Sequence, residues 1–409
     1  MRPVAITGLG VVSSVGNDPA SFFDSLIACR SGIRALPSSS PEQGCPTRIA
    51  GTVQFDPADH LAATECESLD RVSQFARAAA TQALADARLR PEAEDRTRIG
   101  VCMGTAMGGA CTLEKAYQAL HFRGPGAIRP LTVPMAMSTA PASSVALAYS
   151  LEGPNMTFST ACSSSAVAIG EAARLIRHGY ADVILAGGAE AMLTDGVMAA
   201  WRALRTLALV DRDDPATSCR PFSKDRSGLV LGEGAAFLVL EAMDRAHARG
   251  APIHAELLGY GAAGDVAHIT RPSVAGQARA MRAALADAHI EPDEIDYVNA
   301  HGTATMVGDR VETAALKEVF GTHARRIPVS STKALHGHMM GATGAAEFVA
   351  AILAIERGAA PPTAHLRVPD PDCDLDYVSE GARTGLRIRT VMSNAFAFGG
   401  SGAVLIARA

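Results

Sequence analysis

One cysteine, two histidines and a lysine stand in short motifs whose residue types suit acyl transfer. Cys162 lies in TACSSSA, His301 in NAHGTAT, and Lys333 and His338 lie in SSTKALHGHMMGATGA. A fourth motif, NAFAFGGSGA around Phe398, forms a glycine-rich segment. Cysteine holds an acyl group as a thioester, and histidines transfer protons or donate hydrogen bonds near neutral pH. The four motifs therefore predict thioester chemistry.

Cys162 is predicted at a turn between a strand and a helix. A lone cysteine in an Ala/Ser-rich segment is most often an ordinary core residue, because free cysteine packs as a small hydrophobic residue. Here residues 156–160 have a strand pattern, and 164–178 have a helical pattern that can start on Ser163 or Ser164. We expect Cys162 to point along the helix axis, where the dipole and free N–H groups stabilise a thiolate.

The two histidines are predicted at the ends of strands. His301 follows YVNA, and His338 lies in a Gly-rich turn ahead of a helix. Most of the 12 histidines are expected to be ordinary residues, but two in matching contexts with Cys162 indicate a shared site. Lys333 is one of only four lysines among 37 basic residues. A lysine where the chain normally has arginine indicates that a compact ammonium group is required at this position. The alternative is a solvated lysine at a strand end.

The turn at residues 396–400 is predicted to bring backbone N–H groups close to a substrate, because glycine permits close approach. Together with the N–H of Cys162, this turn would form an oxyanion hole. The alternative is a plain β-turn between two C-terminal strands.

Short strand patterns alternate with longer helical ones, which predicts an α/β fold with a buried, largely parallel sheet covered by helices. Each side of residues 250–260 contains a strand that leads into a turn with a reactive group. This pattern suggests two related halves, residues 1–255 and 256–409, that share one core. We expect strands at 4–8, 99–103, 183–187, 235–241, 297–300 and 403–407, and helices at 70–87, 164–178, 276–288, 309–320 and 343–356.

Composition limits the classes of function. The 409 residues are 48% hydrophobic, enough for one large core or two fused ones. A net charge of -5 gives no reason to expect nucleic acid or an anionic membrane as partner. No signal peptide or membrane span is recognised, so a soluble, cytoplasmic protein is expected. The eight cysteines include no CxxC pair, which argues against a disulfide framework or a zinc site.

On these motifs the chain resembles the β-ketoacyl-[acyl carrier protein] synthases of the elongating Cys-His-His type, which have the thiolase fold. The likeness runs from ITGLGVVSSVG to GGSGAVLIA, essentially the whole chain. It implies a duplicated five-layer αβαβα fold, a dimer of identical or homologous subunits, and a phosphopantetheine-bearing acyl carrier protein as partner. It implies no metal or redox cofactor. The implied reaction condenses an acyl thioester with malonyl-carrier in fatty acid or polyketide synthesis. The alternative is a ketosynthase subunit that works with a non-catalytic chain-length partner.

The resemblance also implies roles for individual residues. Cys162 would accept the acyl group, His301 and His338 would promote decarboxylation and stabilise the enolate, and Phe398 would gate the site and donate an N–H to the thioester oxygen. The remaining residues are Lys333 and Glu347 as polar support, Asp309 and Glu312 as a structural acidic pair, Thr303 and Thr305 on the pantetheine arm, Gly399 in the substrate-binding turn, Met107 and Thr132 in the acyl pocket, and Arg123, Arg129 and Arg202 in carrier docking.

Several residues depart from the family pattern. AFGGSGA stands where GFGGTNA is usual, so Ala397 stiffens the turn and Gly402 removes an amide side chain. Glu65 and Glu67 lie in a region that is usually basic, which leaves carrier docking to the three arginines. In the acyl pocket, methionine replaces a branched aliphatic residue at 107 and threonine replaces an aromatic at 132. These changes predict a longer, bulkier or unsaturated acyl substrate.

Three rival classes are disfavoured. A thiolase needs a second cysteine in the C-terminal Gly-rich turn, and Cys373 lies instead in PDPDCDLDY. A dinucleotide-binding oxidoreductase would need a glycine where Ser13 stands and an acidic partner about 20 residues further on. A serine hydrolase would need a GxSxG motif, which the serines after Cys162 do not form.

Overall fold

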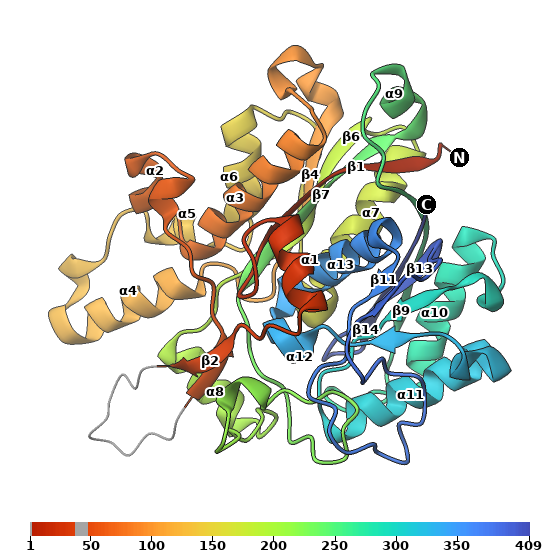
Figure 1. The fold of residues 1–409 in the computed structure, drawn as a ribbon. Helices are drawn as coiled ribbons and strands as arrows, with labels where there is room; N and C mark the ends of the chain where they lie inside the picture. Colours follow the sequence, from red (N-terminus) through yellow and green to blue (C-terminus); the bar gives the residue numbers. More distant parts are fainter. Residues whose placement is uncertain (1, 37–47) are drawn as a thin grey trace.

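The computed structural model describes residues 2–36 and 48–409, and ten of its strands form one mixed sheet (Figure 1). The strand order is β10-β9-β13-β14-β8-β1-β7-β6-β4-β5. The sheet consists of two five-stranded halves, which join where β1 (Val4–Val12) pairs with β8 (Ala255–Gly264). Only two residue pairs make this junction, whereas β1 pairs with β7 (Gly234–Ala242) along most of its length.

The two halves repeat one topology. Each half has a parallel pair at its outer edge, a second parallel pair, and then two antiparallel pairs. The duplicated fold implied by the resemblance is therefore confirmed. The other strands are β5 (Asn155–Phe158), β4 (Ile99–Gly104) and β6 (Val183–Glu190) in the first half, and β10 (Val329–Ser330), β9 (Tyr297–Asn299), β13 (Thr390–Phe396) and β14 (Ser401–Arg408) in the second.

The expectation of a largely parallel sheet is wrong, because antiparallel pairs occupy the middle of the ten-stranded sheet, on both sides of the junction between the halves. β13 and β14 are joined by a short turn, which allows only an antiparallel hairpin, whereas parallel pairs need a crossover that usually contains a helix. The sequence did not reveal this mixture, since strands such as β1 are buried along their whole length and carry no alternating pattern.

Helices complete five layers around the two half-sheets (Figure 1). α7 (Ser164–Arg177) and α13 (Thr343–Arg357) pack between the halves, and residues Thr343 to Ala354 are all buried. α3 (Arg71–Asp86) and α6 (Ala140–Tyr149) cover one outer face, and α10 (Val274–Ala288) and α11 (Met306–Phe320) cover the other. Alanines on the inner helices permit this close packing.

Side-chain caps fix where several helices start. The N-cap residues Asp70, Ser273 and Thr305 accept hydrogen bonds from the N–H groups of Val72, Gly276 and Gly308, and so begin α3, α10 and α11. The other elements are α1 (Pro19–Ile27), β2 (Ile33–Leu36), β3 (Arg48–Gly51), α2 (Ala63–Ser68), α4 (Ala110–Arg123), α5 (Thr132–Ala136), α8 (Asp195–Ala203), α9 (Met243–Ala248), α12 (Lys333–His336), β11 (Ala359–Ala360) and β12 (Arg383–Thr384). Within the described ranges, no helix has the length and apolar character needed to span a bilayer.

Candidate active site

Cys162 lies in a short 3-10 turn, Ala161–Ser163, between β5 and α7, as the sequence predicted. Ala161 has φ 51°, which is uncommon for a residue other than glycine. The hydroxyl of Ser164 accepts a hydrogen bond from the N–H of Thr160 at 2.9 Å and donates to the carbonyl of Ala161 at 2.7 Å. The strained turn therefore holds Cys162 at the start of α7.

The structure brings Cys162 and both predicted histidines into one pocket. Cys162 Sγ and one ring nitrogen each of His301 and His338 lie within 4.8 Å of one another. The imidazole centroids are 5.5 Å apart and the rings are nearly perpendicular, at 83°. All three residues and Phe398 line a cavity of about 270 Å³. A thiol and two imidazoles are also ligands for soft metal ions, so this geometry alone fits either use.

The turn that carries His301 is fixed by one buried carboxylate. Glu312 on α11 accepts hydrogen bonds from the N–H groups of His301 and Gly302, both at 2.8 Å, and from the side-chain amide of Asn394 at 3.1 Å. Burial raises the pKa of Glu312, and these donors oppose the rise. Gly302 has φ 30°, which favours glycine at this position. Glu312 thus has the structural position that the resemblance implies.

His338 presents a free N–H donor to the pocket. The N–H of Met340 donates to His338 Nδ1 at 3.2 Å, and the hydroxyl of Thr343 lies 2.9 Å from the same nitrogen. A ring nitrogen that accepts a hydrogen bond carries no proton, so the neutral ring is protonated at Nε2. Among the described residues, Nε2 of His338 has no partner. It is therefore available to a substrate.

Lys333 and Glu347 form a buried ion pair beside the histidines. Lys333 Nζ donates to both carboxylate oxygens of Glu347, at 2.7 and 2.8 Å, and both side chains are buried. Burial, together with the positive charge of Lys333, holds the pKa values of His301 and His338 well below 6.5. Both imidazoles are therefore neutral near neutral pH.

The thiol of Cys162 is protonated in the resting site. Burial raises the pKa of Cys162 to about 11, while the N–H of Phe398 and the ammonium of Lys333 act in the opposite direction. The N–H groups work as predicted, but burial outweighs them. Burial by the surrounding pocket therefore decides the protonation state of the resting thiol.

The Gly-rich turn is tied to the loop at residues 265–272. The N–H of Gly399 donates to the carbonyl of Ile269 at 2.8 Å, and the N–H of Asp265 donates to the carbonyl of Gly400 at 2.7 Å. The ring of Phe398 stacks on Trp201, with centroids 6.0 Å apart and planes at 23°. These contacts hold the backbone N–H of Phe398 near the sulfur of Cys162.

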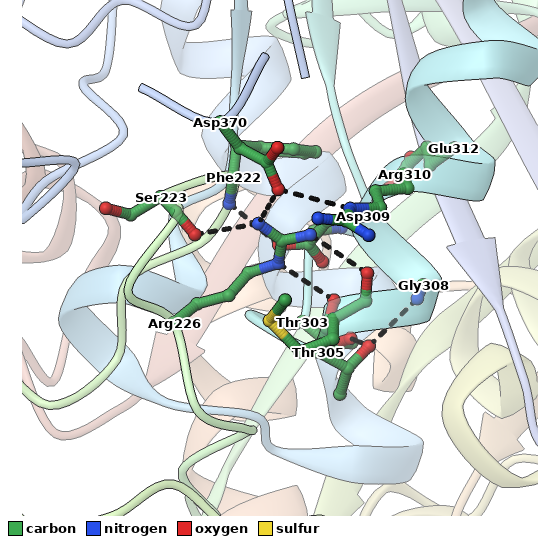
Figure 2. A network of polar contacts seen from close by, with 12 residues as sticks. Phe222, Ser223, Arg226, Thr303, Thr305, Gly308, Asp309, Arg310, Glu312 and Asp370 are labelled. Carbon is green, nitrogen blue, oxygen red and sulfur yellow. Dashed lines mark hydrogen bonds and ion pairs between the residues drawn. The ribbon is translucent and has the colours of Figure 1, made fainter. Parts of the chain in front are cut away.

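A buried polar network supports the two threonines (Figure 2). The hydroxyls of Thr303 and Thr305 lie 3.0 Å apart, and both residues line the cavity of Cys162. Asp309, on the same helix as Glu312, accepts from the N–H of Phe222 at 2.7 Å and pairs with Arg226 at 3.4 Å. The predicted acidic pair is therefore buried: Glu312 holds the His301 turn, and Asp309 pairs with Arg226.

The predicted acyl-pocket residues lie outside the lining of this cavity. Met107 is 44% exposed, and its N–H donates to the buried carboxylate of Glu190 at 3.1 Å. Thr132, at the start of α5, lines a second cavity of about 840 Å³. Two of the predicted docking arginines, Arg123 and Arg129, line that second cavity, whereas Arg202 is exposed on α8 next to Trp201. The roles of these residues stay predictions.

Comparisons with known proteins agree with this geometry. Residues 1–246 match the N-terminal domain of beta-ketoacyl synthases, and 254–367 match the C-terminal domain. The chain is 42% identical to 3-oxoacyl-[acyl-carrier-protein] synthase 2 of Coxiella burnetii, over 99% of this chain and 98% of the relative. The chain belongs to the β-ketoacyl synthase family.

Two solved structures show the same fold as this synthase. The ishigamide ketosynthase/chain length factor superposes with a TM-score of 0.92 and 36% identity. A type II polyketide ketosynthase, solved with its acyl carrier protein and bound to the hexaketide, has a TM-score of 0.92 and 33% identity. Each alignment covers 100% of this chain and 99% of the other. The thiolase-type fold and the membership in the acyltransferase class are therefore confirmed.

Sequence reasoning missed several residues of this synthase. Glu190 accepts from three backbone N–H groups beside the pocket, and Arg226 holds the threonine segment. Neither residue carries a sequence signal of its own. Arg226, for example, is one of 33 arginines in the chain. Trp201 is the only tryptophan, and that scarcity could have marked it.

Proposed function

We propose that this synthase condenses an acyl group held on Cys162 with a malonyl group on an acyl carrier protein. The clustering of the Cys162 sulfur with one nitrogen each of His301 and His338, all within 4.8 Å, carries this proposal. A thiol beside neutral imidazoles and the N–H of Phe398 suits acyl transfer followed by carbon–carbon bond formation.

In the first step, Cys162 Sγ attacks the carbonyl carbon of the acyl thioester. The bond from that carbon to the pantetheine sulfur breaks, and the thiol proton of Cys162 ends on the leaving pantetheine thiolate. Because the pKa of the thiol is about 11, proton transfer must accompany the attack. The N–H groups of Cys162 and Phe398 stabilise the tetrahedral oxyanion.

In the second step, the malonyl thioester loses carbon dioxide and leaves an enolate. Nε2–H of His338 and the neutral ring of His301 stabilise the enolate oxygen through hydrogen bonds. The enolate carbon then attacks the acyl-Cys162 carbonyl, and the bond to Sγ breaks. The released thiolate takes a proton from water, and the hydroxide combines with the released carbon dioxide to give bicarbonate. The resting enzyme and a β-ketoacyl carrier result.

The proposed partner is an acyl carrier protein, which is the partner of one of the solved relatives. Thr303 and Thr305 would bind its pantetheine arm, Gly399 would shape the entrance, and Arg123, Arg129 and Arg202 would contact its surface.

We also propose that residues 1–255 and 256–409 are the two halves of the protein. A cytoplasmic location is proposed as well, because the seven described cysteines are all free thiols, as is usual in a reducing compartment.

One apolar surface fits either a homodimer or a second function, that of a ketosynthase subunit paired with a non-catalytic chain-length partner. Large apolar side chains are exposed on α4, α5, α6, the segments next to α4 and α5, and the edge strand β5, and such a patch marks a protein interface. We propose that a thiolase-fold subunit covers it, either a second copy or a homologous chain-length partner, as the name of one relative describes. The exposed residues are Met107, Leu113, Tyr117, Leu120, Phe122, Val133, Met137, Leu147 and Met156. Native mass spectrometry with an activity assay separates the two: an active homodimer favours the first function, and an inactive lone chain the second.

Intact-protein mass spectrometry tests the main proposal. After incubation with acyl carriers of different chain lengths, wild-type protein should gain one acyl group on Cys162, and the lengths accepted should identify the substrate class. Cys162→Ala should abolish acylation. His301→Ala should spare acylation but reduce condensation with malonyl-carrier by about 100-fold or more. Normal condensation by either variant would contradict the proposed roles.

A further inference from the structure

We infer that Arg226 is a positioning residue, which joins two walls of the pocket so that Thr303 and Thr305 bind the pantetheine arm in a fixed geometry. The inference rests on the condensing activity proposed above. It adds a residue that lies outside the cysteine and histidine set and does not touch the reacting atoms.

The guanidinium of Arg226 is bonded through all three of its nitrogens (Figure 2). Nε donates to the carbonyl of Thr305 at 3.1 Å, and Nη2 donates to the carbonyl of Met306 at 2.9 Å. Nη1 donates to the carbonyl of Ser223 at 2.7 Å and to the carboxylate of Asp370 at 2.7 Å. The side chain has no exposed surface, so these bonds are shielded from water.

These bonds join two walls of the pocket. Thr305 and Met306 begin α11 and line one wall, whereas Ser227, Gly228 and Leu229, which directly follow Arg226, line another. A single side chain therefore sets the position of the first wall relative to the second. No other described side chain bonds both the Thr305 carbonyl and the segment before Ser227.

The threonine pair has one hydroxyl proton left for a ligand. The two hydroxyls share one hydrogen bond at 3.0 Å, and Thr305 Oγ1 also accepts from the N–H of Gly308 at 3.2 Å. Two hydroxyls carry two protons, and their mutual bond uses one. The other is free to donate to an amide carbonyl, the group that recurs along a pantetheine arm. Because the two hydroxyls are bonded to each other, the direction of this proton depends on the backbone of Thr305, which Arg226 fixes.

An arginine is needed for this geometry. Arg226 lies between two buried carboxylates, Asp309 at 3.4 Å and Asp370 at 2.7 Å. Burial raises the pKa of Asp309 to about 7, and Arg226 opposes that rise. A planar guanidinium reaches four acceptors in fixed directions, whereas an ammonium has three donors on one atom. Lysine would keep the charge but release the Thr305 or Met306 carbonyl.

Arg226→Lys tests the inference, with Arg310→Lys as the matched control. Arg310 contacts the same Asp370 at 3.2 Å, but its side chain is 43% exposed and holds no pocket wall. Three probes are compared: octanoyl-pantetheine, the octanoyl thioester of ethanethiol, which lacks the amides, and iodoacetamide. Acylation and alkylation of Cys162 are followed by intact mass and normalised to the reactive thiol.

Arg226→Lys should raise KM for octanoyl-pantetheine by about 10- to 100-fold, since displacement of about 1 Å in a binding group has effects of this size. Its reactions with the two small probes should change by less than about threefold, and Arg310→Lys should match wild type on all three. Equal losses on all probes would assign Arg226 a purely structural role and overturn the inference, as would equal KM values for the two variants.

Failure of the proposed function and failure of the variant to fold can both be distinguished from failure of the inference. If wild-type Cys162 takes no acyl group from either thioester, the proposed function fails, independently of Arg226. If Arg226→Lys does not fold, Asp370→Asn weakens the hold on the guanidinium from the far side and should raise KM for octanoyl-pantetheine alone. An unchanged KM in folded Asp370→Asn would then overturn the inference.

Discussion

Two adjacent glycines in the turn after Phe398 should differ greatly in how much activity the same substitution removes. Gly399 and Gly400 have φ values of 81° and 82°, so alanine at either position is strained by about 1 to 2 kcal/mol. Their surroundings differ. A Cβ on Gly399 would have no neighbour within 4 Å, whereas a Cβ on Gly400 would lie 1.8 Å from the carbonyl oxygen of Asp265.

The geometry gives the size of the effect. Ordinary contact at a Cβ begins at 3.4 Å, so Gly400→Ala must move the turn or the Asp265 loop by about 1.6 Å, the difference between 3.4 and 1.8. A shift above about 1 Å in a catalytic group costs roughly 100-fold, and loss of one oxyanion donor costs about 100- to 1,000-fold. Because the turn supplies the N–H of Phe398, Gly400→Ala should slow acylation of Cys162 by at least about 100-fold.

Single-turnover acylation from octanoyl-pantetheine, followed by intact mass, measures this loss. Alkylation by iodoacetamide passes through no oxyanion, so its rate should change by only a fewfold in both variants. Trp201, the only tryptophan, stacks on Phe398, and its fluorescence should shift in Gly400→Ala alone. Gly399→Ala should keep acylation within about 30-fold of wild type, which is the upper limit that its strain energy of about 1 to 2 kcal/mol allows. Equal acylation rates in the two variants would refute the reasoning from the Asp265 clash.

Two further predictions concern buried charge. Lys333→Met should lower the free energy of unfolding by about 3 to 5 kcal/mol, because it leaves the carboxylate of Glu347 unpaired, and adding Glu347→Gln should recover most of that loss; urea unfolding that found the double variant no more stable than the single one would contradict this. Burial lowers the pKa of His254, but the carboxylates of Asp86 and Glu356 outweigh burial and raise the pKa to about 9. The charged histidine therefore stabilises the folded state fully below pH 6.5, and this contribution is lost as the pH rises through 9. The free energy of unfolding of wild type should exceed that of His254→Gln by about 1 to 2 kcal/mol at pH 6, after allowance for screening of the partly exposed carboxylates. This difference should approach zero at pH 10. A difference that does not change with pH would exclude the charged histidine.

The reactive residues could be predicted because their local context is itself the signal. Cys162 and His301 each follow a strand and open a turn, and strand ends at one edge of a sheet lie near one another in space. The charge state of the thiol was not predictable, since it depends on burial by segments far along the chain. Arg226 was missed for a similar reason: three of its four acceptors, two carbonyls and a carboxylate, are about 80 and 144 residues away. Thr132 was assigned by position in the family, and nothing local to it indicates which cavity it lines.

The repeated topology of the half-sheets places two equivalent helix starts against each other. α7 follows β5 and begins beside the nucleophile, and α13 follows β10, the counterpart of β5, and begins just after His338. The two helices touch there, with the N–H of Ala345 donating to the hydroxyl of Ser165 at 2.9 Å. The arrangement is that of two similar copies fused in one chain, whose equivalent helix starts meet beside Cys162 and His338. One copy supplies the sulfur and the other supplies both imidazoles, so the proposed chemistry depends on the fusion of the two.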